Sequence, residues 1–217
     1  MLFHLRKTFI LANTVIVKSL ERLNKKSCLG LILSLNSPKV QAALIKPRRF
    51  RDHRGFFCET YNRNLYAEME IDLEFVQDNH SLSFDKGVLR GLHFQAPPRA
   101  QAKLVRCGRG AIYDVIVDIR LGSPNYGEWQ GYELTNENGY QLYVPVGFAH
   151  GFVTLEPNSE IVYKCTDYYA PEAEGAIRWD GCEIDWPLAG DPILSEKDSV
   201  APLLKDFKSP FRFGENS

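Results

Sequence analysis

Histidine and glycine recur at similar spacing in two segments of the chain. The first, GVLRGLHFQ, spans residues 87–95 and carries His93 near its end. The second, GYQLYVPVGFAH, spans residues 139–150 and ends on His150. A neutral histidine is the side chain best suited to take up a proton near pH 7, so both segments are candidates for acid–base chemistry. The alternative is that each histidine is a hydrogen-bonded core residue on its strand.

Further polar side chains near the first segment suit the same chemistry: Gln77, Asn79, Arg90, Gln95 and Lys103. Lysine and arginine can stabilise an oxyanion or hold a phosphate. The chain therefore offers a base, cations and amide groups close together in sequence.

Both segments also resemble the paired motifs of the cupin jelly rolls, and the second fits the pattern G-x5-P-x-G-x2-H. Metal-binding cupins take two histidines, as H-x-H, and a glutamate from the first motif, and a third histidine from the second. Here Gln95 stands in place of the second histidine, and no glutamate follows within several residues. His93 and His150 alone are too few for a histidine-rich transition-metal site. The sequence predicts a cupin barrel without that metal site.

The elements that must position these side chains are short strands. Residues 111–120 alternate with a period of two, placing Tyr113, Val115, Val117 and Ile119 on one well-buried face and Asp114 on the other. Similar runs, separated by turn residues, occupy 103–107, 132–135, 141–144, 152–155 and 160–165. The pattern predicts an all-β sandwich or barrel, here a cupin jelly roll with a few short helices.

Two further elements are expected outside the strands. A short helix is predicted over residues 65–69, with Asn64 capping its start. The proline-rich chain after Pro187 is expected to wrap the core as a tail.

Charge divides the 217 residues unevenly, although the formal net charge is only −1. Residues 1–50 hold ten basic side chains and one acidic side chain, whereas the other 16 basic and 26 acidic side chains lie in residues 51–217. We interpret residues 1–35 as a basic, poorly ordered N-terminal extension, and residues 36–217 as one domain. Nucleic-acid binding is not expected, because an arm that binds it usually carries denser lysine and arginine clusters.

Composition excludes several classes of protein. With 44% apolar and 24% charged residues the chain is in the globular range, and no run approaches the roughly 20 apolar residues of a membrane helix. The cysteines are odd in number, widely spaced and without a C-x-x-C pair: Cys28, Cys58, Cys107, Cys165 and Cys182. Reduced thiols in the cytoplasm are therefore expected.

Seven longer strings together resemble the dTDP-4-dehydrorhamnose 3,5-epimerase family. They are RDHRGFFCETYN (51–62), FVQDNHSLS (75–83), GVLRGLHFQAPPRAQAKLVRC (87–107), VPVGFAHGFVTL (144–155), YKCTDYYAPEAEGAIRWD (163–180), IDWP (184–187) and LSEKD (194–198). The resemblance runs from about residue 40 to residue 204, so it covers nearly the whole domain and leaves residues 1–35 outside.

This resemblance implies a cofactor-independent isomerase. Its substrate would be dTDP-4-dehydro-6-deoxy-D-glucose, inverted at C3 and C5 through an enolate to dTDP-4-dehydro-L-rhamnose, in the synthesis of dTDP-L-rhamnose for cell-surface polysaccharide. By motif position His93 is the implied base, Asp198 the carboxylate that orients it, Lys103 the group that stabilises the enolate, and Tyr163 the acid on the opposite face. Tyr168 is a weaker candidate for the acid.

The resemblance also implies the residues that bind the nucleotide sugar. They are Arg54, Glu59, Gln77, Asn79, Arg90, His150, Glu174 and Lys197. Arg54 and Arg90 suit the diphosphate, because a guanidinium bonds two oxygens at once; the alternative for Arg54 and Glu59 is a surface ion pair. Phe56, Tyr140 and Trp129 are either core residues or stack on thymine. Family members are homodimers with crossing N-terminal strands, so residues 40–59 are expected to complete the site of a neighbouring subunit.

Three different functions remain open. The first is an epimerase with the same fold that inverts only C3 or only C5 of another dTDP-deoxysugar. The second is a metal-dependent cupin oxygenase or isomerase. The third is a cupin that binds nucleotide sugars without catalysis, against which His93, Lys103, Tyr163 and Asp198 argue.

Overall fold

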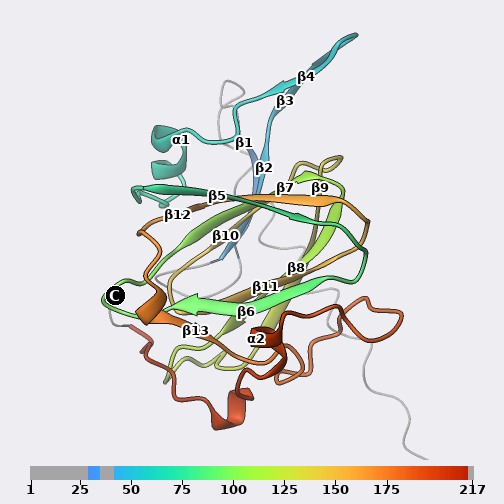
Figure 1. Ribbon diagram of the computed structural model, residues 1–217. Helices are drawn as coiled ribbons and strands as arrows, with labels where there is room; N and C mark the ends of the chain where they lie inside the picture. The colour runs from blue at the N-terminus through green and yellow to red at the C-terminus, as the bar shows by residue number, and fades with distance from the viewer. Residues whose placement is uncertain (1–28, 35–41, 215–217) are drawn as a thin grey trace, which may run out of the picture.

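The computed structural model describes residues 29–34 and 42–214. Within these residues the chain is mainly β-strand, with short helical elements (Figure 1). The strands are β1 (Leu29–Ser34), β2 (Ala43–Pro47), β3 (Arg49–Asp52), β4 (Gly55–Cys58), β5 (Gln77–Ser83), β6 (Leu89–Gln95), β7 (Lys103–Arg109), β8 (Ala111–Asp118), β9 (Trp129–Thr135), β10 (Gln141–Val144), β11 (Phe148–Thr154), β12 (Ser159–Cys165) and β13 (Glu174–Ala176). The helical elements are α1 (Arg63–Ala67), η3 (Pro171–Ala173), α2 (Glu196–Ser199) and η4 (Leu204–Asp206).

Two antiparallel sheets face each other and enclose the core. The six-stranded sheet has the order β1-β2-β10-β7-β12-β5, and the five-stranded sheet has the order β13-β6-β11-β8-β9. Strands β3 and β4 form a separate hairpin, which projects away from the two sheets (Figure 1). The all-β prediction is confirmed, and each predicted strand is present, with its ends moved by at most a few residues.

Strand β8 is buried on both faces, whereas its sequence predicts one well-buried face. Ile112 and Ile116 join the core between the sheets. Val115 and Val117 join a second core cluster on the outer face, which includes Phe211 from the C-terminal tail. The predicted wrapping tail therefore covers the face of Val115 and Val117, whereas the face that carries Asp114 is buried against the opposite sheet.

Helix α1 begins two residues earlier than predicted. Its N-cap is Asn62, not Asn64: the Asn62 side-chain oxygen accepts hydrogen bonds from the backbone N–H groups of Asn64 at 3.1 Å and Leu65 at 3.4 Å. Both asparagines can cap a helix, and packing decides between them. The buried Tyr66 hydroxyl lies 2.9 Å from Oε1 of Gln141 on β10, which ties the helix to the outer face of the six-stranded sheet.

Strand β1 lies within the predicted extension and pairs antiparallel with β2 at the edge of the six-stranded sheet. Residues 1–28 and 35–41 lie outside the described residues, so the predicted poor order of the extension and its boundary at residue 35 stay predictions. None of the helices in the described ranges has the length and apolar character needed to cross a membrane.

Candidate active site

The side chains that face the space between the sheets follow from strand alternation and register. On β7, Val105 belongs to the central core, so Lys103, two residues earlier, faces the same interior. Cys165 on β12 is paired with Lys103, and Tyr163 with Val105, so both also face inward. From the five-stranded sheet, His150 lies directly opposite His93 in the ladder between β11 and β6. The interior thus collects polar groups from both sheets.

A β-bulge turns Arg90 toward the same interior. His93 pairs with His150 and Arg90 with Phe152, so the chain between Arg90 and His93 carries one residue more than its partner. Gly91 lies at this bulge with a φ of +119°, and a Cβ there would meet the Cα of Gly151 at 2.6 Å. Only glycine fits such a close approach with a positive φ. Simple alternation would have placed Arg90 and His93 on opposite faces.

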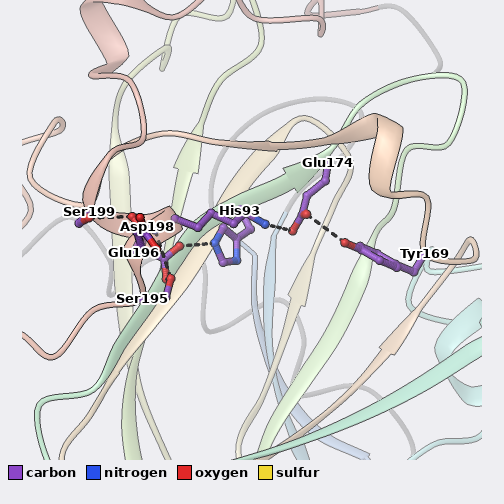
Figure 2. Close-up of polar contacts among 8 residues, drawn as sticks. His93, Tyr169, Glu174, Ser195, Glu196, Asp198 and Ser199 are labelled. Carbon is purple, nitrogen blue, oxygen red and sulfur yellow. Dashed lines mark hydrogen bonds and ion pairs between the residues drawn. The ribbon is translucent and has the colours of Figure 1, made fainter.

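His93 and Asp198 form a hydrogen-bonded pair, with Nε2 of His93 2.6 Å from Oδ1 of Asp198 (Figure 2). A carboxylate only accepts hydrogen bonds, so Nε2 carries the proton and Nδ1 is the basic nitrogen. Asp198 is in the first turn of α2, where Ser195 caps the helix and donates to Oδ2 at 2.8 Å. Burial alone would raise the pKa of Asp198, but the hydrogen bonds from His93 and Ser195 hold that pKa below its usual range.

Lys103 and Tyr163 lie side by side, with the lysine Nζ 6.0 Å from the centre of the tyrosine ring. Burial lowers the pKa of Lys103, and the nearby Cys165, Asp114 and Glu174 oppose this change. Burial raises the pKa of Tyr163, with Cys165 acting in the same direction and Arg90 against it. The site therefore places a buried lysine next to a phenol that keeps its proton.

The predicted binding residues Glu174 and Lys197 form an ion pair. Glu174 also accepts a hydrogen bond from the Tyr169 hydroxyl at 3.0 Å (Figure 2). Gln77 in turn accepts from the Tyr169 backbone N–H at 2.9 Å and donates to Asn79 at 3.0 Å. Tyr169, which sequence reasoning missed, thus joins the two groups of predicted binding residues.

His150 is paired with a second residue that the sequence did not single out as functional. Its Nε2 lies 2.7 Å from Oδ1 of Asp114 on β8, and Asp114 is fully buried. The sequence does contain a pattern that identifies Asp114 as a buried acid, because Asp114 lies between the apolar residues Ile112 and Ile116 on one face of a strand. An acid flanked in this way on an inward face is buried, and buried acids are paired.

Arg54 and Glu59 are not brought to the other site residues within this chain. Arg54 is exposed at the tip of the hairpin and pairs with Asp52 at 2.6 Å. Glu59 accepts a hydrogen bond from Asn62 at 3.1 Å, and the surface ion pair that Arg54 forms is with Asp52. Phe56 is 53% exposed on the same hairpin.

The other aromatic residues that were candidates for the site differ in how far they are buried. Tyr140 packs against the central core and Trp129 against the outer cluster, which favours their interpretation as core residues. Tyr168 is 59% exposed, whereas Tyr163 packs against the central core beside Lys103, so the geometry favours Tyr163 over Tyr168 as the acid.

Gln95, at the position of the second cupin histidine, bonds to the backbone. It donates to the carbonyl oxygens of Arg99 and Tyr168 and accepts from the Ala170 N–H at 2.9 Å. It thereby holds the segment that leads into β13. In the parts of the chain that the structure describes, no three or more His, Cys, Asp or Glu side chains gather as a metal ion would require.

One cavity of about 340 Å³ lies against the six-stranded sheet, and Asn79 and Tyr163 of the candidate site are among its lining residues. Its lining includes Leu104 and Arg106 from β7 and Lys164 from β12, whose side chains alternate with the inward-facing ones. This cavity therefore opens on the outer face of the sheet, and His93, Lys103 and Asp198 do not line it.

Two facing β-sheets with a histidine–aspartate pair, a lysine and a tyrosine between them define a cupin-type barrel with a cluster of ionisable side chains in its interior. The sequence profile of the dTDP-4-dehydrorhamnose 3,5-epimerase family matches residues 39–206. This chain belongs to that family, which confirms the resemblance found in its motifs.

Individual relatives support the assignment. A dTDP-4-dehydrorhamnose 3,5-epimerase of Salmonella typhimurium is 52% identical over 164 residues, 74% of this chain and 89% of that enzyme. The crystal structure of a dTDP-6-deoxy-D-glucose-3,5-epimerase from Legionella pneumophila, in complex with dTDP-4-keto-L-rhamnose, matches with a TM-score of 0.80 and 43% identity, over 85% of this chain and 99% of that one. A 3′-monoepimerase from Streptomyces bikiniensis, in complex with dTDP-quinovose, matches with a TM-score of 0.71 and 33% identity, over 76% of this chain and 84% of that one.

Proposed function

We propose that this protein epimerises dTDP-4-dehydro-6-deoxy-D-glucose at C3 and C5 to dTDP-4-dehydro-L-rhamnose, on the route to dTDP-L-rhamnose. The observation that carries the proposal is the His93–Asp198 pair, which faces the same interior as Lys103 and Tyr163. Family membership supplies the substrate class, and these four side chains supply the chemistry.

The reaction needs a base on one face of the sugar and an acid on the other. The protons on C3 and C5 are acidic because the C4 ketone takes up the electron pair as an enolate. Nδ1 of His93 removes the proton, and Asp198 stabilises the imidazolium that forms. Lys103 stabilises the charge on the C4 oxygen. Tyr163 then donates its proton to the opposite face of the carbon, which inverts the centre and leaves a phenolate to be reprotonated.

Burial supports the role of Tyr163, and the acidic groups near Lys103 support the role of the lysine. Raising the pKa of Tyr163 keeps the phenol protonated over the whole neutral range. Lys103 remains an ammonium at neutral pH only if nearby negative groups offset its burial, and Asp114 and Glu174 are such groups. The polar groups around them, including Arg90, Gln77 and Asn79, would hold the nucleotide diphosphate.

Solvent deuterium provides the direct test. In deuterated water the purified protein, given the 4-keto sugar nucleotide, is expected to place deuterium at both C3 and C5, because each carbon loses its proton to the base and regains one from the solvent pool. Mass spectrometry with NMR assigns the label carbon by carbon. Absence of label at both carbons would refute the proposed function.

The second candidate is an epimerase that acts on one carbon. The structural match to the 3′-monoepimerase favours it over a metal-dependent oxygenase and over a binding protein without catalysis, because that enzyme shares the fold and binds a dTDP-sugar. The same experiment separates the two epimerases: label at C3 alone, persisting after long incubation, would support the single-carbon enzyme.

We further propose a homodimer in which the hairpin of one subunit completes the site of the other. Arg54 and Phe56 are exposed on a hairpin that projects from the barrel (Figure 1), although family resemblance assigns this region to the substrate site. Exposed aromatic and arginine side chains are typical of residues that become buried at an interface.

Mixing two inactive variants tests this sharing of sites. His93→Ala and Arg54→Ala homodimers are each expected to be impaired, but a mixed dimer has one site with both defects and one site with neither. After unfolding and refolding together, activity should return to roughly a quarter of the wild-type value, as random pairing in a twofold dimer predicts. No recovery, with dimers present by sedimentation velocity, would contradict a shared site.

We propose a cytoplasmic location without nucleic-acid or membrane partners, which cell fractionation tests. The buried cysteines Cys107, Cys165 and Cys182 are not in disulfides, as is usual in a reducing compartment.

A further inference from the structure

Asp114 carries the one buried side-chain oxygen or nitrogen without a hydrogen-bond partner among the described residues. Its side chain is fully buried on β8, between Ile112 and Ile116. Oδ1 lies 2.7 Å from Nε2 of His150, whereas Oδ2 accepts no hydrogen bond from any residue that the structure describes. Only one of the two carboxylate oxygens therefore has a hydrogen-bond partner among the described residues.

Such an oxygen is costly to keep. A buried carboxylate loses its hydration, and an unsatisfied acceptor in the interior destabilises the fold. A nearby cation offsets this cost only when it faces the same space. His150 bonds to one oxygen, so the second oxygen is available to a positive group.

Lys103 faces this space from the opposite sheet, and Arg90 on β6, which is also turned inward, donates to Ser83 Oγ at 3.2 Å and to the Leu82 carbonyl oxygen at 3.3 Å. Lys103 projects inward from β7, and Asp114 projects inward from β8. The other ionisable groups around Lys103 are Cys165 and Tyr163 on β12 and Glu174 on β13. Cys107 on β7 and His150 on β11 are the further ionisable groups near Asp114.

Glu174 is already engaged elsewhere, with Lys197 and with the Tyr169 hydroxyl. Cys165 accepts a hydrogen bond from Asn79 at 3.5 Å, and burial raises the pKa of its thiol, so it remains neutral. Asp114 is thus the carboxylate with acceptor capacity to spare near Lys103.

We propose that Asp114 is a positioning residue for Lys103: its unpartnered Oδ2 keeps the lysine charged and directs the ammonium toward the C4 oxygen as the enolate forms. The inference rests on the proposed epimerisation. His150 holds Asp114 in place through Oδ1, so the His150–Asp114 pair acts on the substrate indirectly, through Lys103.

The pH dependence follows from the charges. Burial lowers the pKa of Lys103 and the charge of Asp114 opposes this, so loss of Asp114 lowers that pKa further. The enzyme needs the protonated lysine, and activity is lost as the pH rises through the pKa of Lys103. Removal of Asp114 must therefore move the alkaline limb of the pH–rate profile to lower pH.

Asp114→Asn tests the proposal, because asparagine has the same shape without the charge and still accepts from His150. The expected result is a kcat lower by about 10- to 100-fold and a KM within about twofold of wild type. The alkaline limb of the pH–rate profile should move to lower pH by about one pH unit. Asp114→Glu, which restores the charge, is expected to return the limb toward its wild-type position. If the asparagine variant does not fold, Asp114→Ser, which leaves room for water, takes its place.

Asp118→Asn is the matched control. Asp118 is equally buried on the same strand, but it bonds to Arg120 and Ser123 outside the site. This variant should unfold at a lower temperature without moving the alkaline limb.

Three results would overturn the role of Asp114: an alkaline limb that stays in place, a rise in KM with kcat unchanged, or equal shifts of the limb in both asparagine variants. These outcomes presuppose a wild-type protein that incorporates deuterium. Failure of the wild type would instead refute the proposed function.

Discussion

Replacement of His93 by asparagine is expected to lower deuterium incorporation at both C3 and C5 by about 10²- to 10⁴-fold, the usual contribution of a general base. Asparagine has no basic nitrogen, so the proton acceptor is lost; its amide matches the Nδ1 side of the imidazole and is too short to replace the Nε2 bond to Asp198, which keeps its hydrogen bond from Ser195. Both carbons should be affected together, because one base serves both sites. The measurement is the initial rate of label uptake at each carbon.

A matched histidine controls for nonspecific effects. His80 on β5 is exposed and pairs with Glu160 at 3.2 Å, away from the interior, so His80→Asn should exchange at the wild-type rate. Circular dichroism verifies that both variants are folded. A His93→Asn enzyme with undiminished exchange would show that another group is the base.

Lys103→Met is expected to reduce kcat by about 10²- to 10³-fold, in the range measured for removal of one group that stabilises an oxyanion. Methionine has nearly the same length and no charge. The thermal midpoint should fall, because the buried Asp114 carboxylate loses the cation that offsets its burial. The remaining activity should lose the alkaline limb that Lys103 causes and decline only at higher pH, where Tyr163 ionises, since burial raises the pKa of that phenol.

Lys164→Met is the corresponding control. Lys164 is adjacent to Tyr163 on β12, but its side chain faces the outer side of the sheet and pairs with Asp78 at 2.8 Å. Its replacement should leave kcat and the pH profile unchanged. Equal losses in the two methionine variants would mean that Lys103 matters for folding and not for the enolate.

The secondary structure was largely predictable because strand alternation and turn residues are local properties. Strand β10 has the predicted bounds, and β7, β8 and β12 are close to theirs. The errors in this prediction arose at positions where packing against residues distant in sequence decides the local structure. Asn62 caps α1 in place of Asn64 because the buried Tyr66 anchors the helix on β10. The facing sheet buries the face of β8 that carries Asp114, which its sequence pattern left as the polar face.

The site was predictable as a set of residues but not as an arrangement. Motif resemblance named His93 and Asp198, which are far apart in sequence, and the structure pairs them. It also named Arg54, which the structure leaves exposed on the hairpin. Sequence reasoning also passed over Asp114, although it lies between Ile112 and Ile116, and the structure draws attention to it through an oxygen without a partner among the described residues.

The sequence by itself determined the class of fold, the family and the chemical groups, because ordered motifs and strand periodicity are written along the chain. Only the tertiary structure decided which groups share one interior. A bulge at Gly91 turns both Arg90 and His93 inward, where alternation would separate them, and the facing sheets bring Lys103 and Asp114 into one space. Both effects depend on the register between strands distant in sequence, which no local pattern encodes.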